Sequence, residues 1–279
     1  VQMVVSGLAR GSVYSLIALG FYITYKTTKT LNFAQGEALM MGAMIGYSSY
    51  VVFGMNYIVS IIIALIVMGA MGALIERVAV RPLRSLATHG YILSTVGAGM
   101  VLKNIAVLTW GGGEHYIPSV FGEEVIKVAG AGILPQELAN FFISMVTMVL
   151  VLVLLQKSLL GKGLRAVALN KDAAGLMGIN VKKLIVFSYV LSTALAALAG
   201  ILISPVTYAS PAMGIIGLKA FGVAIIGGIG NPIGIVLAGL LLGVSEFLFG
   251  ILGASWREAS AFIMIMLILA VRPDGLFSR

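Results

Sequence analysis

Apolar stretches separated by short polar segments follow one another along the whole chain. Eight of them predict membrane-spanning helices, at about residues 3–25, 31–50, 57–75, 89–108, 138–155, 184–203, 233–252 and 259–271. A ninth, at residues 215–226, is short and runs into the glycine-rich sequence GGIGNPIG. The pattern predicts an all-α fold: a polytopic transmembrane helical bundle of eight full spans plus one short Gly-interrupted segment. We expect a single transmembrane domain over residues 1–279.

The composition agrees with a protein that lies in a membrane. Of the 279 residues 60% are hydrophobic and 10% are charged, and the mean hydropathy is +1.08. A soluble domain cannot cover so much apolar surface with so few charges, so membrane lipid is the expected surrounding. The absence of cysteine excludes disulfides, thiolate metal sites and cysteine nucleophiles. The glycine pairs Gly7/Gly11 and Gly239/Gly243 have the spacing that lets membrane helices approach closely.

The net charge of +8 is distributed as a topology signal, and it needs no nucleic-acid partner. If successive spans alternate in direction and the short segment 215–226 also crosses, or nearly does, thirteen of the 18 basic residues share one face: Lys26, Lys29, Arg77, Arg81, Arg84, Lys157, Lys162, Arg165, Lys171, Lys182, Lys183, Arg272 and Arg279. The positive-inside rule makes that face, and the C-terminus with it, cytoplasmic. Residues 110–137, which carry Glu114, Glu123, Glu124 and Glu137 against Lys127, then form an extracytoplasmic loop on the side of the N-terminus.

The polar segment 161–183 interrupts the apolar pattern on the basic face. Its apolar residues fall at helical spacing in two groups and predict two short helices: Leu164, Val167 and Ala168, then Ala173, Leu176 and Met177. Asp172 can cap the second helix, Gly178 can end it, and Asn180 can cap the next span. A structured, partly apolar knob favours docking of a soluble partner, and an amphipathic connector lying on the lipid surface is the alternative.

Known enzyme and cofactor motifs do not occur. There is no G-x-x-x-x-G-K-[ST] phosphate loop, and Ile233 stands where a dinucleotide fingerprint needs its third glycine. His89 and His115 are far apart in the chain, so no metal site is predicted. We therefore expect a chain that is no enzyme and binds no cofactor.

Polar residues inside the apolar spans are the candidates for a solute path, because each is costly to place in hydrocarbon. Glu246 lies mid-span in LLGVSEFLFG, Lys219 follows an external turn and is expected at an outer mouth, and Glu37 lies near the inner face. Asn32 and Gln35 add uncharged contacts where the sequence NFAQG interrupts the second span. Interrupted spans in transporters often line the path, and a frayed helix start is the alternative reading of NFAQG. The second interruption, GNPIG, is expected to be a tight cytoplasmic turn.

Several long stretches resemble one family of membrane proteins. They are GLARGSVYSLIALGFYITYKTTKTLNFAQGE, GLRAVALNKDAAGLMGINV, ALAALAGILISP, SPAMGIIGLKAFGVAIIGGIGNPIGIVLAGLLLGVSE and the ending VRPDGLF. In this order they resemble the permease subunit of branched-chain (Leu/Ile/Val) amino acid ABC importers, and most closely the shorter, H-type subunit. The resemblance covers most of the chain.

This resemblance implies a multi-pass subunit of the bacterial inner membrane that moves branched-chain or other hydrophobic amino acids inward by alternating access. The implied partners are a second, related permease (as a hetero- or homodimer), two cytoplasmic ATPase subunits that use the ATP, and a periplasmic solute-binding protein. Segment 161–183 corresponds to the coupling loop that sits on an ATPase. Its recurring positions are Arg165, Asn170, Ala173, Ala174 and Gly178. Gln35 departs from the family, where many members have histidine, which bears on substrate preference.

Three other functions remain open. An ion-driven secondary transporter would use Glu246 and Lys219 as coupling groups and would work without an ATPase. A membrane scaffold would have little use for interrupted helices and charges inside spans. An ABC permease for another small polar solute, such as urea or an amide, a nucleoside or a sugar, would keep the architecture and change the cargo.

Overall fold

The structure, a computed structural model, describes residues 2–83, 88–122, 124–128, 131–272 and 275–277. Its elements are α1 (Gln2–Thr28), α2 (Gln35–Tyr47), α3 (Tyr57–Ile75), α4 (Thr88–Trp110), β1 (Ile126–Val128), β2 (Ala131–Ile133), α5 (Pro135–Lys157), α6 (Leu159–Leu169), α7 (Lys171–Leu176), α8 (Val181–Thr207), α9 (Gly214–Ile226), α10 (Pro232–Phe249) and α11 (Ala254–Val271), with short π or 3₁₀ turns at Ser48–Val52, Glu76–Val80, Arg81–Leu83, Pro211–Met213 and Gly250–Leu252. The fold is the predicted all-α polytopic bundle. Arg84, Glu123 and Arg279, whose charges entered the topology prediction, lie outside the described residues.

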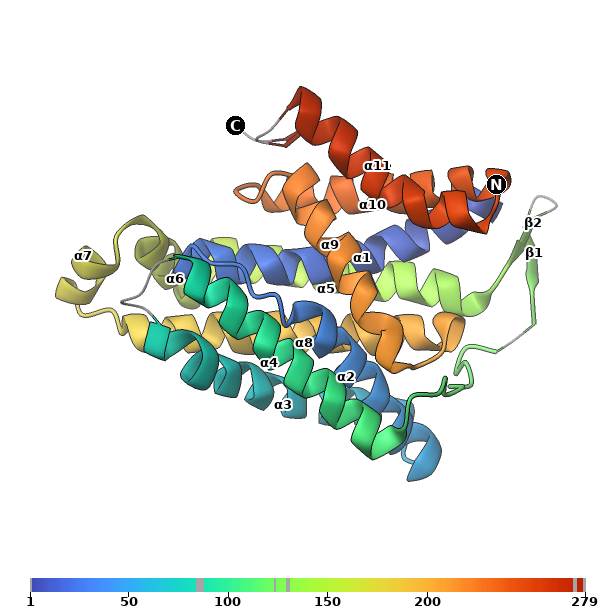
Figure 1. Cartoon of the computed structure of the whole chain (residues 1–279), viewed down its shortest axis with the longest axis horizontal. Helices are drawn as coiled ribbons and strands as arrows, with labels where there is room; N and C mark the ends of the chain where they lie inside the picture. The colour runs from blue at the N-terminus through green and yellow to red at the C-terminus, as the bar shows by residue number, and fades with distance from the viewer. Residues whose placement is uncertain (1, 84–87, 123, 129–130, 273–274, 278–279) are drawn as a thin grey trace.

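Seven described helices are long and apolar enough to cross a membrane, and they coincide with seven of the eight predicted spans. The second predicted span, residues 31–50, is different. The chain leaves α1 at Lys29, whose φ is +60°, and has no helical structure until Gln35. α2 then has 13 residues, and the π turn Ser48–Val52 extends it. The predicted short segment 215–226 is α9, a helix of 13 residues that crosses the bundle obliquely (Figure 1).

α1 and α8 form the centre of the bundle, and most of their residues are buried, whereas α4, α5 and α11 bury few. α1 packs against α5, α8, α9 and α10. Its contact with α10 is made by the two predicted glycine pairs. A Cβ atom at Gly7 would lie 2.7 Å from the Cα of Val244, and one at Gly11 would lie 2.5 Å from the carbonyl oxygen of Gly239. The backbones of the two helices therefore touch, as the glycine spacing predicted.

The polar segment 161–183 folds as two short helices, as predicted. α7 projects beyond one end of the bundle (Figure 1). The cap of α7 is Asn170, whose Oδ1 accepts from the backbone N–H groups of Asp172 and Ala173. The prediction that Asp172 is the cap was wrong, because Asn170 takes the extended conformation (φ −154°, ψ 115°) that an N-cap needs. Gly178 has the left-handed φ of +81° that ends a helix, and Asn180 caps α8.

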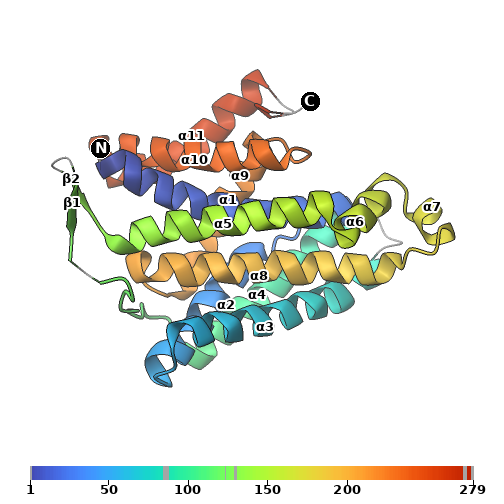
Figure 2. The ribbon, with the colours of Figure 1, turned by 180° about the vertical axis from the view of Figure 1, so that it is seen from behind.

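Segment 110–137 lies at the opposite end of the bundle, on the same side as the start of α1 (Figure 1). It contains the antiparallel β1–β2 hairpin, and the backbone of His115 bridges to that of Ala209 just after α8. The ring of Tyr47 stacks on His115 at 4.6 Å. Figure 2 shows the reverse face, where α5 and α8 run side by side between the two ends. The two polar segments predicted from the sequence, 161–183 and 110–137, therefore lie at opposite ends of the spanning helices.

Candidate functional site

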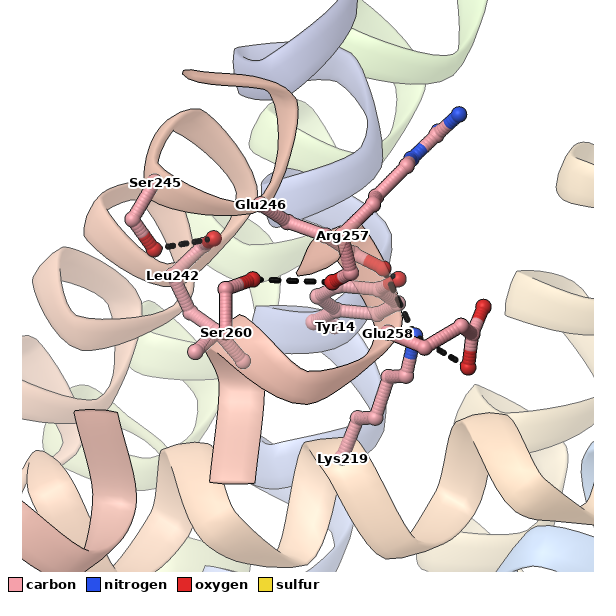
Figure 3. A network of polar contacts seen from close by, with 8 residues as sticks. All are labelled: Tyr14, Lys219, Leu242, Ser245, Glu246, Arg257, Glu258 and Ser260. Carbon is pink, nitrogen blue, oxygen red and sulfur yellow. Dashed lines mark hydrogen bonds and ion pairs between the residues drawn. The ribbon is translucent and has the colours of Figure 1, made fainter. Parts of the chain in front are cut away.

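A buried ion pair joins α9 to α10. The Nζ atom of Lys219 lies 2.6 Å from Oε1 of Glu246, and the two side chains are 4% and 0% exposed. The hydroxyl of Tyr14, on α1, donates to Oε2 of Glu246 over 2.7 Å. Lys219 also lies 3.4 Å from Oε2 of Glu258, a largely exposed side chain at the start of α11 (Figure 3). One cluster therefore fixes the short helix α9 to three neighbouring helices.

Burial determines what this cluster can do. A charge that loses its partner in a low-dielectric interior carries a penalty of several kcal/mol, so Lys219 and Glu246 stabilise each other. Tyr14 occupies the second oxygen of Glu246, which leaves that carboxylate no free acceptor oxygen within this cluster. The expectation of Lys219 at an outer mouth is corrected, because the residue is only 3% exposed. The geometry is that of a buried structural contact that holds neighbouring helices together.

Two arginines lie beside this cluster. The guanidinium carbon of Arg257, on α11, is 4.2 Å from the centre of the Phe247 ring, and that of Arg10, on α1, is 5.4 Å from it. Figure 3 shows the Arg257 side chain pointing away from the Lys219–Glu246 pair. The surroundings of Phe247 thus hold two more positive charges, and the ring stabilises them by cation–π contact.

The interruption before α2 places Gln35 deep in the bundle. Its Nε2 donates to the carbonyl oxygen of Ser192 over 2.9 Å, and its Oε1 accepts from the Ser192 hydroxyl over 2.9 Å. That hydroxyl also lies 2.9 Å from the carbonyl oxygen of Gly20. Because Gly20 and Ser192 lie well inside α1 and α8, α2 begins within the span rather than at its end. NFAQG is therefore an interruption at depth, and the frayed-end interpretation does not hold.

Two polar groups of the interrupted segment lack partners in the described part of the chain. Asn32 is fully buried and its Oδ1 accepts from the N–H of Ala34, but its Nδ2 has no hydrogen-bond partner. Glu37 is half-buried on the first turn of α2, and its Oε2 has none either. The Glu37 carboxylate packs against the backbone at Gly214, where a Cβ atom would come within 2.5 Å of Oε1. A carboxylate with a free oxygen therefore lies where α2 meets the start of α9.

The positions predicted for ATPase coupling lie together at one end of the bundle, on α6, on α7 and in the short connections on either side of α7. Nη1 of Arg165 donates to the carbonyl oxygens of Leu155 (2.6 Å) and Gln156 (3.1 Å), which pins α6 to the end of α5. Ala174 is buried and Ala173 is exposed. Beyond them the apolar side chains of Leu176 and Met177 are 90% and 83% exposed. The knob combines a rigid anchor with an exposed apolar tip.

The model of the family described as "Branched-chain amino acid transport system / permease component" matches residues 3–271 of the chain. The chain belongs to this family. It is 34% identical to the high-affinity branched-chain amino acid transport system permease protein BraD of Pseudomonas aeruginosa, over 100% of this chain and 95% of BraD. It is 31% identical to the corresponding protein LivH of Salmonella typhimurium, over 100% and 95%. In fold it is similar to PsaBC from Streptococcus pneumoniae in complex with Fab, with a TM-score of 0.56 at 10% identity over 98% of this chain and 91% of that one.

Sequence reasoning found part of this permease's polar core and missed the rest. Lys219 and Glu246 were identified as separate charges, and nothing in their spacing of 27 positions pairs them. Tyr14 was missed although it lies one helical turn after Arg10 on α1, a spacing that puts both on one face. Glu258 was missed because the last span was predicted to begin at residue 259, whereas α11 begins at Ala254.

Proposed function

We propose that the chain is the transmembrane permease subunit of an ATP-driven ABC importer that moves branched-chain or other hydrophobic amino acids into the cytoplasm by alternating access. The observation that carries this proposal is the likeness over the full chain to permeases named for branched-chain amino acid transport. The chain itself binds no cofactor in this proposal, and ATP is hydrolysed by partner subunits. The protein is then a multi-pass component of the bacterial inner membrane.

The α6–α7 knob is the proposed contact with an ATPase subunit. Leu176 and Met177 supply an exposed apolar tip, and the bonds of Arg165 to the end of α5 tie that tip to a spanning helix. A push on α7 would therefore move α5 rather than a loose loop. Two ATPases would engage two such knobs, one on this chain and one on a second, related permease subunit.

The same proposal assigns each end of the bundle to one side of the membrane. The knob lies at one end and the β1–β2 hairpin at the other (Figure 1). The basic residues make the knob end cytoplasmic, with the C-terminus there. Segment 110–137 is then extracytoplasmic, and its hairpin is the proposed docking surface for a periplasmic solute-binding protein.

For the solute path we propose the junction of α2 and α9. Glu37 brings a carboxylate with an unpartnered oxygen to this junction, and it suits the ammonium group of an amino acid. Asn32 and Gln35 shape the same interrupted segment. Lys219 and Glu246 do not contact the solute in this proposal. Their ion pair, together with the Tyr14 hydrogen bond, holds α9 against α1 and α10 and so positions one wall of the path.

The test is uptake of labelled leucine into proteoliposomes that contain this chain with the permease, ATPases and binding protein encoded beside it. We expect uptake that requires the ATPases with their ATP and the binding protein on the opposite side, and that isoleucine and valine reduce by competition. Hydrolysis without leucine uptake would reassign the solute to another small molecule and keep the architecture. Uptake by this chain alone under a proton or sodium gradient would refute the proposal in favour of an ion-coupled transporter.

A further inference from the structure

A cavity of about 310 Å³ lies at the knob end of the bundle, between the last turns of α1, the second half of α6 and the α9–α10 turn. Lys26, Lys29 and Arg165 line it, together with the apolar side chains of Leu169 and Ile229. None of its lining residues is acidic. The cavity thus presents three cations from two segments that are far apart in the sequence: Lys26 and Lys29 at the end of α1 and just after it, and Arg165 on α6.

The lysines of this cavity are held by tyrosines. Nζ of Lys26 donates to the hydroxyl of Tyr22 and lies 4.9 Å from the centre of that ring. Nζ of Lys29 lies 5.8 Å from the ring of Tyr25. Within the described ranges, the ion pairs involve neither lysine. Positioned cations that face a cavity without a carboxylate are a site for an anion.

A second cavity of about 210 Å³ adjoins the first and shares Tyr22, Lys26, Arg165 and Gly230 with it. Its further walls are mainly apolar, from Leu152, Leu155, Leu164 and Pro232. The combined space therefore has charge at its shared wall and hydrocarbon along its length. An amphiphile matches that lining better than a free inorganic anion does.

The depth of the cavity fits a lipid headgroup. Tyr22 and Tyr25 lie in the last two turns of α1, a membrane-spanning helix, where aromatic side chains are typical of the headgroup level. The lysines that follow them end that helix on the basic face. Basic pockets between spanning helices on the cytoplasmic side suit anionic headgroups.

We propose that this cavity binds an anionic phospholipid, with its phosphate on Lys26 and Lys29 and an acyl chain along the apolar walls of the second cavity. The site is formed by this chain alone and does not depend on the transport proposal. Its wall includes Leu169, the residue before the Asn170 cap of α7. A bound lipid therefore supports the end of α6 directly beside α7.

The test is lipid binding to the full chain purified in detergent, measured by native mass spectrometry with phosphatidylglycerol and phosphatidylcholine of identical acyl chains. We expect phosphatidylglycerol to bind more tightly than phosphatidylcholine. The double variant Lys26→Gln/Lys29→Gln is expected to weaken phosphatidylglycerol about 30-fold, from the attraction of two surface lysines to an anionic lipid, and to leave phosphatidylcholine unchanged. Arg165 is left intact because it also pins α6.

The control is Lys182→Gln/Lys183→Gln, which removes the same charge from exposed positions at the start of α8, outside both cavities. This variant should bind phosphatidylglycerol like the unmodified chain. Equal loss in both variants, or equal binding of the two lipids, would overturn the proposal. Displacement of the lipid by millimolar inorganic phosphate would assign the site to a free anion instead. If Lys26→Gln/Lys29→Gln lost binding of the ATPase subunits while its lipid binding stayed unchanged, the cavity would be assigned to a protein partner.

Discussion

The Lys219–Glu246 pair allows a quantitative test of the buried contact that holds α9 against α10. In Lys219→Met the carboxylate of Glu246 stays buried with the Tyr14 hydroxyl as its hydrogen-bond partner, and Arg257 remains as a nearby positive charge that does not contact it. We expect a loss of about 3–5 kcal/mol in the free energy of unfolding, because the remaining buried charge loses the only counter-ion that forms an ion pair with it among the described residues. Glu246→Gln is expected to lose less, about 1–3 kcal/mol, since its amide oxygen can still accept from Tyr14 and Lys219 keeps Glu258 at 3.4 Å.

The double variant Lys219→Met/Glu246→Gln tests whether the two side chains are energetically coupled or contribute independently to the free energy of unfolding. It removes both charges, so its loss should stay below that of Lys219→Met alone, at about 1–3 kcal/mol. The assay is equilibrium unfolding in mixed micelles, with Lys183→Met on the exposed start of α8 as the matched control. Additive losses in the double variant would refute the buried ion pair, because two independent side chains would then explain the data.

Three further predictions concern the knob and the path. Asn170→Ala removes the cap of α7, about 1 kcal/mol of helix stability, and should weaken ATPase binding in a pull-down while Asn104→Ala on the exposed face of α4 does not. Gly178→Leu places a side chain at φ +81°, which strains the turn by about 1–2 kcal/mol; ATP hydrolysis should continue while leucine uptake falls, and normal uptake would contradict the coupling assignment. Glu37→Gln should lower uptake while the amount of inserted protein, measured by immunoblot, stays constant; an equal fall in both would make Glu37 structural.

Hydropathy predicted most of the bundle because a spanning helix must satisfy its backbone internally and present apolar side chains throughout. Hydropathy alone left the interruption at residues 29–34 undecided: the sequence NFAQG indicated one, but Leu31, Phe33 and Ala34 are apolar whether or not the backbone is helical. What breaks the helix there is local and tertiary. Lys29 adopts a positive φ, and the N–H of Phe33 bonds to the side chain of Thr95 on α4 at 3.3 Å.

Periodicity likewise predicted the two helices of segment 161–183 and missed the cap. Asn170 and Asp172 both have side chains that can cap a helix, and only the backbone angles decide between them. The polar core was harder still. Tyr14, Lys219 and Glu246 come from three helices, and the crossing that brings them together is set by how α9 lies against α1 and α10.

The mid-depth start of α2 also constrains the order in which the protein can be assembled during synthesis. The partner of Gln35, Ser192, is 157 positions later in the chain. At a ribosome rate of 5–20 residues per second, roughly 8–30 s pass before α8 exists to receive these hydrogen bonds. During that interval the non-helical backbone of residues 29–34 cannot rest in lipid with its polar groups unpaired. Final placement of α2 therefore waits for α8, and the first half of the protein matures only after this helix of the second half has been made.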